Sequence, residues 1–412
     1  MKAEIIAVGT EILVGDIVNT NAQFLSQRLF ALGIDMYYQT VAGDNPSHLT
    51  EAIRLAFSRA DMVVLSGGLG PTEDDLTKET VAEYFYVPLL FHNEIAEQIQ
   101  SYLHGKSSKS NLKQAYIPEG AIVLANHCGT APGIILEKDN KIAILLPGPP
   151  SELLPMFTES VEPYLKARSG TVMAEKYMRL FGIGESRVGE ITADLMEGSN
   201  PTLAPYAKDH EVLLRIAAKA ASQAEADALI EGMHQKVKER LGDYIYAYGE
   251  QTMVQTVAAL LLQKKLTVAC AESCTAGLLT AALGDIPGIS AVLSESVVTY
   301  SNEAKMKCLG VSAQTLDRFG AVSEETAREM ALGIQKAAGS DIGVSVTGIA
   351  GPDGGTPEKP VGLVYVGVAY QSHVTVLKLQ LNGSRQRVRQ AAVMHALNGV
   401  RQQILKFEKN DR

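Results

Sequence analysis

Short apolar strands alternate with single helices in two separate parts of this chain. In the first part, the expected strands and helices cover residues 2–8, 21–32, 34–41, 47–60, 62–66 and 76–85. In the second part the same rhythm begins with a helix at 252–264 and ends with a helix at 385–405. Strands separated by single helices pair as parallel neighbours through right-handed crossovers. The sequence therefore predicts an α/β fold with two βα-rich domains and mostly parallel sheets.

A segment of different character separates the two parts. It is small and mixed, and it predicts a connecting α+β domain with few candidate catalytic groups. A polar run at 167–173 precedes it, and Tyr248-Gly249-Glu250 follows it. We therefore expect three domains, which cover residues 1–168, 171–246 and 250–412.

Composition and charge exclude several classes of protein. Of 412 residues, 46% are hydrophobic and 20% are charged, which is typical of a packed globular protein. The net charge of −9 argues against sequence-independent nucleic-acid binding, because that binding needs a basic face. No apolar run approaches the roughly 20 residues that a membrane helix needs, and the N-terminus carries no signal-peptide pattern. We expect a cytoplasmic protein that does not associate with membranes.

A glycine-rich loop follows the buried strand at 62–66. It reads Gly67-Gly68-Leu69-Gly70 and continues into Pro71-Thr72-Glu73-Asp74-Asp75. Glycines between a strand and a helix let backbone N–H groups approach an anion. The loop lacks the Lys-Ser/Thr of a Walker A motif and the spacing of a dinucleotide fingerprint. It predicts a phosphate site, and the alternative is a tight turn without a ligand.

Acidic residues gather at the same predicted sheet edge. Asp74 and Asp75 close the glycine loop, Asp44 follows the strand at 34–41, and Thr10 follows the first strand. Open α/β sheets bind ligands at the carboxyl ends of their strands. Carboxylates beside a phosphate site commonly hold a divalent metal. Asp44, Asp74 and Asp75 are therefore candidate metal ligands, and the alternative for each is a helix N-cap.

In the last part, Ser273 lies where a strand at 266–271 meets a helix predicted at 275–283. A serine at the N-terminus of a helix is a candidate nucleophile, because the helix dipole favours an alkoxide or oxyanion there. The alternative is a serine that only caps the helix.

A serine nucleophile needs a base, and the histidines of this part, His373 and His395, have no evident partner. Lys305 is the candidate base, because it lies one turn into a helix that follows a strand and burial lowers the pKa of a lysine. Tyr300 is placed to relay or orient the proton. The alternative for Lys305 is a solvated helix lysine.

A second glycine-rich loop follows another buried strand and spans residues 346–356. Such a loop can supply oxyanion donors or a phosphate nest, and the alternative is a flexible lid without direct contact. Arg385, Arg387 and Arg389 open the last helix. Arginines at this end oppose the helix dipole, which indicates an anionic partner; the alternative is surface solubility.

The motifs of the first part resemble the CinA family, in its domain that is similar to molybdopterin-binding proteins. They cover residues 9–11, 15–21, 67–77, 129–133 and 146–152. The resemblance implies that Gly67, Gly68 and Gly70 cradle a phosphate near Thr10, and that Asp44 and Asp75 are the acidic positions. It implies hydrolysis of ADP-ribose with a divalent metal (Mg, Mn or Co). The alternative is binding of a pterin or molybdopterin-like ligand.

Four motifs of the last part resemble the carboxy-terminal CinA domain, which also occurs alone as nicotinamide mononucleotide deamidase. They cover residues 271–277, 300–305, 346–356 and 383–389. The resemblance implies a cofactor-free amidase with Ser273 as nucleophile, Lys305 as base and Tyr300 nearby. It also implies substrate contacts from Glu272, Thr275, Asn302, Thr347, Gly348, Arg385 and Arg389.

The expected partners are therefore small-molecule nucleotides, namely nicotinamide mononucleotide and ADP-ribose. The resemblance further implies a homodimer. A hypothesis of another class is a non-catalytic competence or DNA-uptake factor. The acidic net charge disfavours it, and residues 171–246 are then the one place where we expect nucleic-acid contact.

Overall fold

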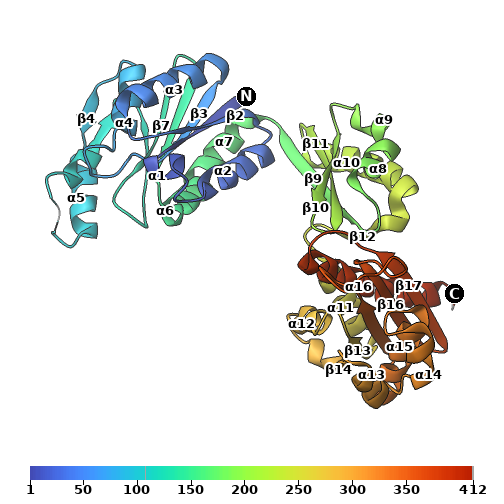
Figure 1. Cartoon of the computed structure of the whole chain (residues 1–412). Coiled ribbons are helices and arrows are strands. Elements are labelled where there is room, and N and C mark those ends of the chain that lie inside the picture. The colour runs from blue at the N-terminus through green and yellow to red at the C-terminus, as the bar shows by residue number, and fades with distance from the viewer. Residues whose placement is uncertain (107, 411–412) are drawn as a thin grey trace. The chain divides into compact units, whose positions relative to one another are not determined.

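The computed structural model describes residues 1–106 and 108–410, which form two compact units. The first unit consists of Met1–Glu175, Gly198–Thr202 and Ile216–His234. The second consists of Lys176–Glu197, Leu203–Arg215 and Gln235–Arg412. A sheet with parallel strands and flanking helices lies at the centre of each unit, which confirms the predicted α/β class (Figure 1).

The first unit is built on a six-stranded sheet of order β2-β1-β3-β8-β7-β6. Its strands are β1 (Lys2–Val8), β2 (Asp35–Ala42), β3 (Met62–Ser66), β6 (Ile122–Leu124), β7 (Gly133–Lys138) and β8 (Lys141–Leu146). The first four in spatial order are parallel, and β7 and β6 add antiparallel pairs at one side. The mostly parallel sheet that the sequence predicts is therefore present.

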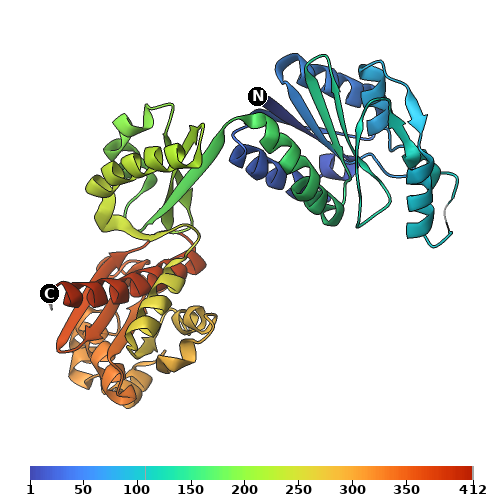
Figure 2. The same ribbon diagram turned by 180° about the vertical axis from the view of Figure 1, so that it is seen from behind.

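Helices cover the two faces of this sheet (Figures 1 and 2). An apolar core lies between the helices and the sheet on each face. Neighbouring residues of β1 point to opposite faces, so that Ile6 enters one core and Ile5 the other. The helices are α1 (Thr10–Leu13), α2 (Thr20–Ala31), α3 (Pro46–Arg59), α4 (Thr77–Tyr84), α5 (Asn93–Tyr102), α6 (Pro150–Met156) and α7 (Glu162–Ser169). Residues of α3, α4 and α5 enter the core of Ile6, and residues of α2 and α6 enter the core of Ile5.

The parallel strands end at one edge of the sheet, and this edge carries the predicted loops. Strand β3 is buried throughout and stops at Gly67, which has φ +102°. A side chain is strained at such a φ, so glycine permits the chain to turn here without leaving the sheet edge. After β2, helix α3 begins at Pro46, with the Asn45 side chain as its N-cap.

The segment between α4 and β6 was not predicted from the sequence. It contains β4 (Leu89–Phe91), α5, a 3₁₀ turn (Asn111–Ala115) and β5 (Tyr116–Pro118). Strands of three residues carry too short a pattern to be recognised by alternation. β4 and β5 form a separate two-stranded antiparallel sheet.

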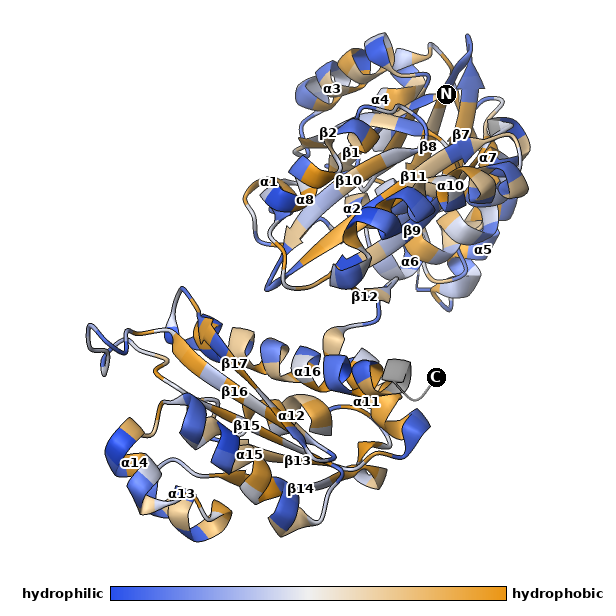
Figure 3. Ribbon diagram, turned by 90° about the vertical axis from the view of Figure 1, so that its right-hand side faces the viewer, coloured by the Kyte–Doolittle hydropathy of each residue, from blue (hydrophilic) through white to orange (hydrophobic). Residues whose placement is uncertain are grey.

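A five-stranded sheet of order β14-β13-β15-β16-β17 forms the centre of the second unit. Its strands are β13 (Val268–Glu272), β14 (Leu293–Val298), β15 (Ile342–Gly348), β16 (Leu363–Tyr370) and β17 (His373–Gln380). β13 is parallel to both β14 and β15, and the last two strands add antiparallel pairs. Figure 3 shows β16 largely in the apolar colour, as expected for a buried strand, and α14 in a mixture of polar and apolar colours, as expected for a helix with one buried face.

Helices flank both faces of this second sheet. They are α11 (Met253–Lys264), α12 (Leu278–Gly284), α13 (Asn302–Leu309), α14 (Ala313–Phe319), α15 (Glu324–Ala338) and α16 (Arg385–Asn410). Cys270 faces the core that α11, α12 and α16 complete, whereas its neighbour Ala271 faces the core of α15. Among residues 1–106 and 108–410, no helix combines the length and the apolar character that crossing a membrane requires.

The connecting segment forms a four-stranded sheet of order β10-β11-β9-β12. Its elements are β9 (Val172–Leu180), α8 (Glu185–Ile191), α9 (Ala193–Met196), β10 (Thr202–Lys208), β11 (Glu211–Ala220), α10 (Gln223–Leu241) and β12 (Ile245–Tyr248). Its residues are divided between the two compact units. The division into three domains at 1–168, 171–246 and 250–412 stays a prediction.

Candidate functional site

Ser273 lies at the carboxyl end of β13 in the second unit. Its backbone N–H donates to the carbonyl of Val346 at 2.9 Å, so the residue continues the pairing of β13 with β15 by one position. The side chain is 9% exposed. The sheet thus fixes the backbone of Ser273 and leaves a small part of the residue exposed.

Lys305 meets Ser273 from helix α13. Its Nζ lies 3.1 Å from Ser273 Oγ, and the residue is only 1% exposed. Ser301 caps this helix and accepts from the backbone N–H of Ala304, which fixes the turn that carries the lysine. The structure therefore brings together the two residues that the sequence predicts as nucleophile and base.

Two carbonyl oxygens orient the amine of Lys305. The Nζ donates to the carbonyl of Thr299 at 2.8 Å and to that of Tyr300 at 3.4 Å. A neutral amine has two N–H bonds and one lone pair, so these two acceptors leave the lone pair for the hydroxyl of Ser273. Burial lowers the pKa of Lys305, because an ammonium ion loses its hydration there. The pair has the geometry of a serine with a neutral amine as its base.

The helix after Ser273 begins later than predicted. It starts at Leu278 rather than at residue 275, so Ser273 does not lie at its N-terminus. The N–H groups of Leu279 and Thr280 bind the carboxylate of Glu272 at 3.0 and 2.8 Å, and Glu272 is fully buried. The expectation that the dipole of this helix favours an oxyanion at Ser273 is therefore wrong, because an internal carboxylate already satisfies the end of the helix.

Both carboxylate oxygens of Glu272 accept hydrogen bonds within the protein. Oε2 accepts from the N–H of Leu279, and Oε1 accepts from the N–H and the hydroxyl of Thr280. This arrangement favours a positioning role for Glu272, which fixes α12 against the end of β13. The direct substrate contact expected of Glu272 stays a prediction.

Two threonine hydroxyls without a hydrogen-bond partner in the described residues lie close in the sequence to Ser273 and Lys305. Thr275 and Thr299 are fully buried, and neither hydroxyl has a partner among the residues that the structure describes. Buried polar groups are normally bonded, so unpaired hydroxyls beside a nucleophile indicate groups that await a ligand or water. This placement is compatible with the substrate contact predicted for Thr275.

Two of the three arginines at the start of α16 reach the loops around Ser273. Arg389 donates to the carbonyl of Thr275 at 2.7 Å. Arg385 donates to the carbonyl of Gly351 at 2.8 Å and to the Tyr300 hydroxyl at 3.1 Å. The phenol of Tyr300 is therefore directed to a guanidinium, and only its backbone carbonyl contacts Lys305. A catalytic part for Tyr300 stays a prediction.

The other residues predicted around Ser273 lie at different depths. Thr347 is buried near the end of β15 and donates its hydroxyl to the carbonyl of Ala321 at 2.7 Å. Gly348 ends β15, and a Cβ there would lie 2.8 Å from the carbonyl oxygen of Leu363. Asn302 is exposed at the first position of α13. Their substrate contacts stay predictions.

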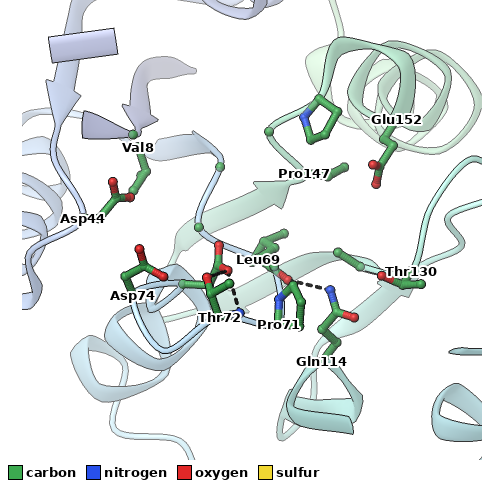
Figure 4. A pocket seen from close by; sticks show the side chains of 18 of the residues that line it. Val8, Asp44, Leu69, Pro71, Thr72, Asp74, Gln114, Thr130, Pro147 and Glu152 are labelled. Carbon is green, nitrogen blue, oxygen red and sulfur yellow. Dashed lines mark hydrogen bonds between the residues drawn. The ribbon is translucent and has the colours of Figure 1, made fainter. Parts of the chain in front are cut away.

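A second candidate site lies at the sheet edge of the first unit. It is a cavity of about 390 Å³ lined by the glycine loop, by the ends of neighbouring strands and by the start of α6 (Figure 4). A Cβ at Gly67 would lie 2.2 Å from the carbonyl oxygen of Val8, and one at Gly70 would lie 2.4 Å from Asp75. Gly68, at φ +68°, is equally restricted. The loop therefore needs glycine at positions 67 and 68, whereas a side chain at position 70 would have to displace the carboxylate of Asp75.

Each of the three predicted metal ligands lines this cavity. Asp44 and Asp74 project into the cavity from one side (Figure 4). The carboxylate of Asp44 accepts from the backbone N–H and the hydroxyl of Thr10 at 2.9 and 2.8 Å. Asp75 accepts from the backbone N–H and the hydroxyl of Thr72. Hydrogen bonding by Thr72 also lowers the pKa of Asp74, which is therefore ionised at neutral pH.

The chemistry of the cavity suits a hard cation that shares its ligands with a phosphate. Glu11 and Glu152 add two further carboxylates to the wall, and carboxylate oxygens are the ligands that Mg²⁺ and Mn²⁺ prefer. In the described part of the chain, however, no group of three or more His, Cys, Asp or Glu side chains is close enough to hold a metal. A cation here would therefore take several of its ligands from bound phosphate and water.

Gln114, which lines this cavity, and its neighbour Lys113 carried no signal in the sequence. Gln114 is 3% exposed and donates to the carbonyl of Leu69, and its own Oε1 has no partner among the described residues. Lys113 donates to the carbonyls of Thr72 and Asp75 and so fixes the end of the glycine loop. Both lie in the segment whose elements were not predicted. An apolar pattern could not reveal them, because each acts through backbone contacts to a distant loop.

Comparison with known proteins divides the chain into three matched regions. Residues 4–167 match a probable molybdopterin binding domain, and residues 175–247 match the damage-inducible protein CinA KH domain. Residues 250–404 match the CinA C-terminal domain.

Relatives match along almost the whole chain. A putative competence-damage inducible protein of Clostridium beijerinckii is 52% identical over 98% of this chain and 100% of the relative. A CinA-like protein of Kosmotoga olearia is 52% identical over 98% of this chain and 99% of the relative. A solved structure of CinA, of unknown function, from Thermoplasma acidophilum is 35% identical, with a TM-score of 0.38, and covers 40% of this chain and 97% of that chain.

Proposed function

We propose a function for this chain on the premise that it belongs to the CinA family, to which its full-length relatives assign it. Its second unit is an amidase that converts the carboxamide of nicotinamide mononucleotide to the acid and ammonia. The contact between Lys305 Nζ and Ser273 Oγ, at 3.1 Å in a nearly closed environment, carries this proposal.

The first half of the reaction uses the two residues in turn. The neutral amine of Lys305 accepts the proton of the Ser273 hydroxyl while Oγ attacks the carboxamide carbon. A tetrahedral oxyanion forms. The Lys305 ammonium then gives its proton to the amide nitrogen, the carbon–nitrogen bond breaks, and ammonia leaves. Ser273 is left as an ester of the nicotinate group.

The second half regenerates the enzyme by the same proton path. Lys305 accepts a proton from water, whose oxygen attacks the ester carbon. The second tetrahedral intermediate collapses, the bond to Oγ breaks, and Lys305 returns the proton to Ser273. The product is nicotinic acid mononucleotide, whose carboxyl group then loses its proton to water. The lowered pKa of Lys305 supports this cycle, since the base must be neutral at its start.

The arrangement of α16 supports recognition of the nucleotide phosphate. Arg385 and Arg389 both reach loops beside Ser273, and a guanidinium is suited to bidentate phosphate binding. Thr275 and Thr299 keep buried hydroxyls for the substrate or for water.

Ammonia release from nicotinamide mononucleotide tests this function. We expect release by the wild-type protein, none by Ser273→Ala, and no effect of a chelator. Turnover by Ser273→Ala within ten-fold of the wild type contradicts the proposal.

A second activity is proposed for the first unit, because its glycine loop and five carboxylates form one cavity. It is the hydrolysis of ADP-ribose at its pyrophosphate. A divalent cation would lie beside Asp44, Asp74 and Asp75 and would take its remaining ligands from phosphate and water. When bound, it would neutralise phosphate charge and activate water. Gly68 and Gly70 would cradle the phosphate with their backbone N–H groups. The N–H of Gly67 already donates to the carbonyl of Leu146 at 3.0 Å, so Gly67 would contribute the turn of the loop toward the phosphate.

Release of AMP from ADP-ribose with added Mg²⁺, Mn²⁺ or Co²⁺ tests the second activity. Binding of a pterin-like ligand without hydrolysis is the alternative for this cavity, and a competence factor without activity is the alternative for the whole chain. The homodimer and the cytoplasmic location stay predictions, and light scattering that gives a monomer mass would contradict the first of them.

A further inference from the structure

A second cavity adjoins the phosphate cavity of the first unit. It has a volume of about 240 Å³ and lies between helix α5 and the segment that follows β6. The two cavities share Thr130, and Gly129 and Ala131 line one cavity each. The two cavities therefore lie next to each other along this segment and meet at Thr130.

Hydrogen bonds and close packing fix the segment that lies between the two cavities. Asn126 donates to Glu152 at 2.7 Å and to the carbonyl of Ala131 at 2.8 Å, and it accepts from the backbone N–H of Cys128. Glu152 itself lines the phosphate cavity. A Cβ at Gly129 would lie 2.2 Å from the carboxylate of Glu152, so the segment packs directly against it. The two cavities are thus fixed relative to each other through one carboxylate.

The chemistry of the second cavity differs from that of the first. Its lining has no acidic residue, no lysine and no arginine, and His127 and Tyr102 are its only titratable groups. Aliphatic side chains of α5 and β6 form the floor, among them Ile99 and Val123. A charged group has no counterion here, whereas a flat, neutral and partly apolar group finds a matching surface.

Tyr102 offers a ring that is fixed yet accessible. Its hydroxyl donates to the carbonyl of Cys128 at 3.0 Å, which ties the ring to the segment that forms the wall. The residue nevertheless stays 49% exposed at the end of α5. A held aromatic ring with an open surface is a stacking platform for a nucleobase. Gln98 adds an amide of the kind that can pair with the edge of a base.

We infer that this second cavity, defined by Tyr102, His127, Gln98 and Val123, is a nucleobase subsite. The first unit would then take a nucleoside phosphate in two parts, with its phosphates at the glycine loop and its base against Tyr102. The inference rests on the phosphate site proposed for the first unit, and it adds what that proposal lacks, namely the group that recognises the nucleoside. Selectivity for a nucleotide over other phosphate esters would come from this cavity.

The test measures binding of two probes to the full-length protein by calorimetry in the presence of Mg²⁺. The probes are AMP and ribose 5-phosphate, which share the phosphate and the sugar and differ by the base. The variants are Tyr102→Ala, which removes the ring, and Tyr102→Phe, which removes only the bond to Cys128. Tyr37→Ala is the matched control, because Tyr37 is 68% exposed on β2 and lines neither cavity.

We expect the wild type to bind AMP at least ten-fold more tightly than ribose 5-phosphate. Tyr102→Ala should weaken AMP binding on the order of ten-fold or more, as loss of a stacked base does, and leave ribose 5-phosphate unchanged. Tyr102→Phe should retain most of the advantage of AMP, and the control should match the wild type. A thermal melt of each variant verifies that the unit stays folded.

Equal affinity of the wild type for the two probes would overturn the inference, and so would a Tyr102→Ala variant that loses both probes equally. Neither result contradicts the proposed hydrolysis, which depends on the glycine loop and the carboxylates. Selective binding of AMP through Tyr102 without any hydrolysis of ADP-ribose supports the subsite and contradicts the proposed hydrolysis. The two proposals therefore fail separately.

Discussion

Replacing Lys305 with methionine removes the proposed base while the volume of the side chain is nearly kept. Lys305 is 1% exposed, so a residue of similar length and apolar character fits the site. The variant loses three hydrogen-bond contacts, to Ser273 Oγ and to the carbonyls of Thr299 and Tyr300. It also loses the cost of burying an amine. These changes oppose each other, and we expect the fold to survive.

The expected loss of activity follows from the role of the amine. A positioned general base contributes about 10²- to 10⁴-fold to a rate. At about 1.36 kcal/mol for each factor of ten, the Lys305→Met variant should lose about 3 to 5 kcal/mol of transition-state stabilisation. The loss should appear in kcat, since Lys305 contacts Ser273.

The dependence of the rate on pH gives an independent test of the same base. Burial lowers the pKa of Lys305 below the ordinary lysine value of about 10.4. Only the neutral amine can accept the proton of Ser273, so the wild-type rate should rise with pH through this lowered pKa. The residual rate of Lys305→Met should lack this rise.

The assay is ammonia release across a range of pH, with circular dichroism and a thermal melt to verify folding. Lys307→Met is the matched control, because Lys307 lies on the same helix and is exposed. It should retain the activity and the pH profile of the wild type. A folded Lys305→Met protein with activity within ten-fold of the wild type would refute the role of the lysine as base.

Three further variants test other parts of the structure. Glu272→Gln places an amide N–H₂ group against the N–H donors of α12. The variant should destabilise the second unit by about 1–3 kcal/mol, measured by thermal unfolding. An unchanged melting temperature would contradict the positioning role of Glu272. Gly67→Ala combines a strained φ with a clash against Val8, so calorimetry should show weaker AMP binding, while ammonia release stays normal; wild-type affinity for AMP would be inconsistent with the cradle. Asp75→Asn should abolish AMP release from ADP-ribose and leave ammonia release unchanged, and loss of both activities would show that the two sites are not independent.

The central strands and most helices could be predicted from the sequence, because their patterns are long and regular. β3 is a run of five buried residues, and α15 has Ser323 as its N-cap followed by two acidic residues. Gly67 marks the turn at the end of β3, since its φ of +102° suits glycine. Each of these elements is determined by residues within it or next to it, so the sequence pattern is sufficient to predict it.

The start of α12 could not be predicted, because no sequence pattern marks the side-chain contact that determines it. The sequence around Thr275 favours a helix there, but Glu272 folds back and accepts from the N–H groups of Leu279 and Thr280. The helix then begins at Leu278. A buried carboxylate is read as a surface residue in a sequence, and only the structure shows that it acts as an internal cap.

The Ser273–Lys305 pair was predicted through positions at strand ends, and the structure gives the contact that these positions imply. Gln114 and Lys113 were missed for the opposite reason. They act at the glycine loop from a segment of three-residue strands and a 3₁₀ turn, where neither periodicity nor a motif marks them. Sequence patterns reveal groups that follow regular elements and miss groups that irregular segments supply.

The most direct test of the account is ammonia release from nicotinamide mononucleotide by the wild type and by Ser273→Ala, each with and without a chelator. The account predicts release that requires Ser273 and that a chelator does not change. No release by well-folded wild-type protein, or equal release by the variant, would contradict the proposed amidase.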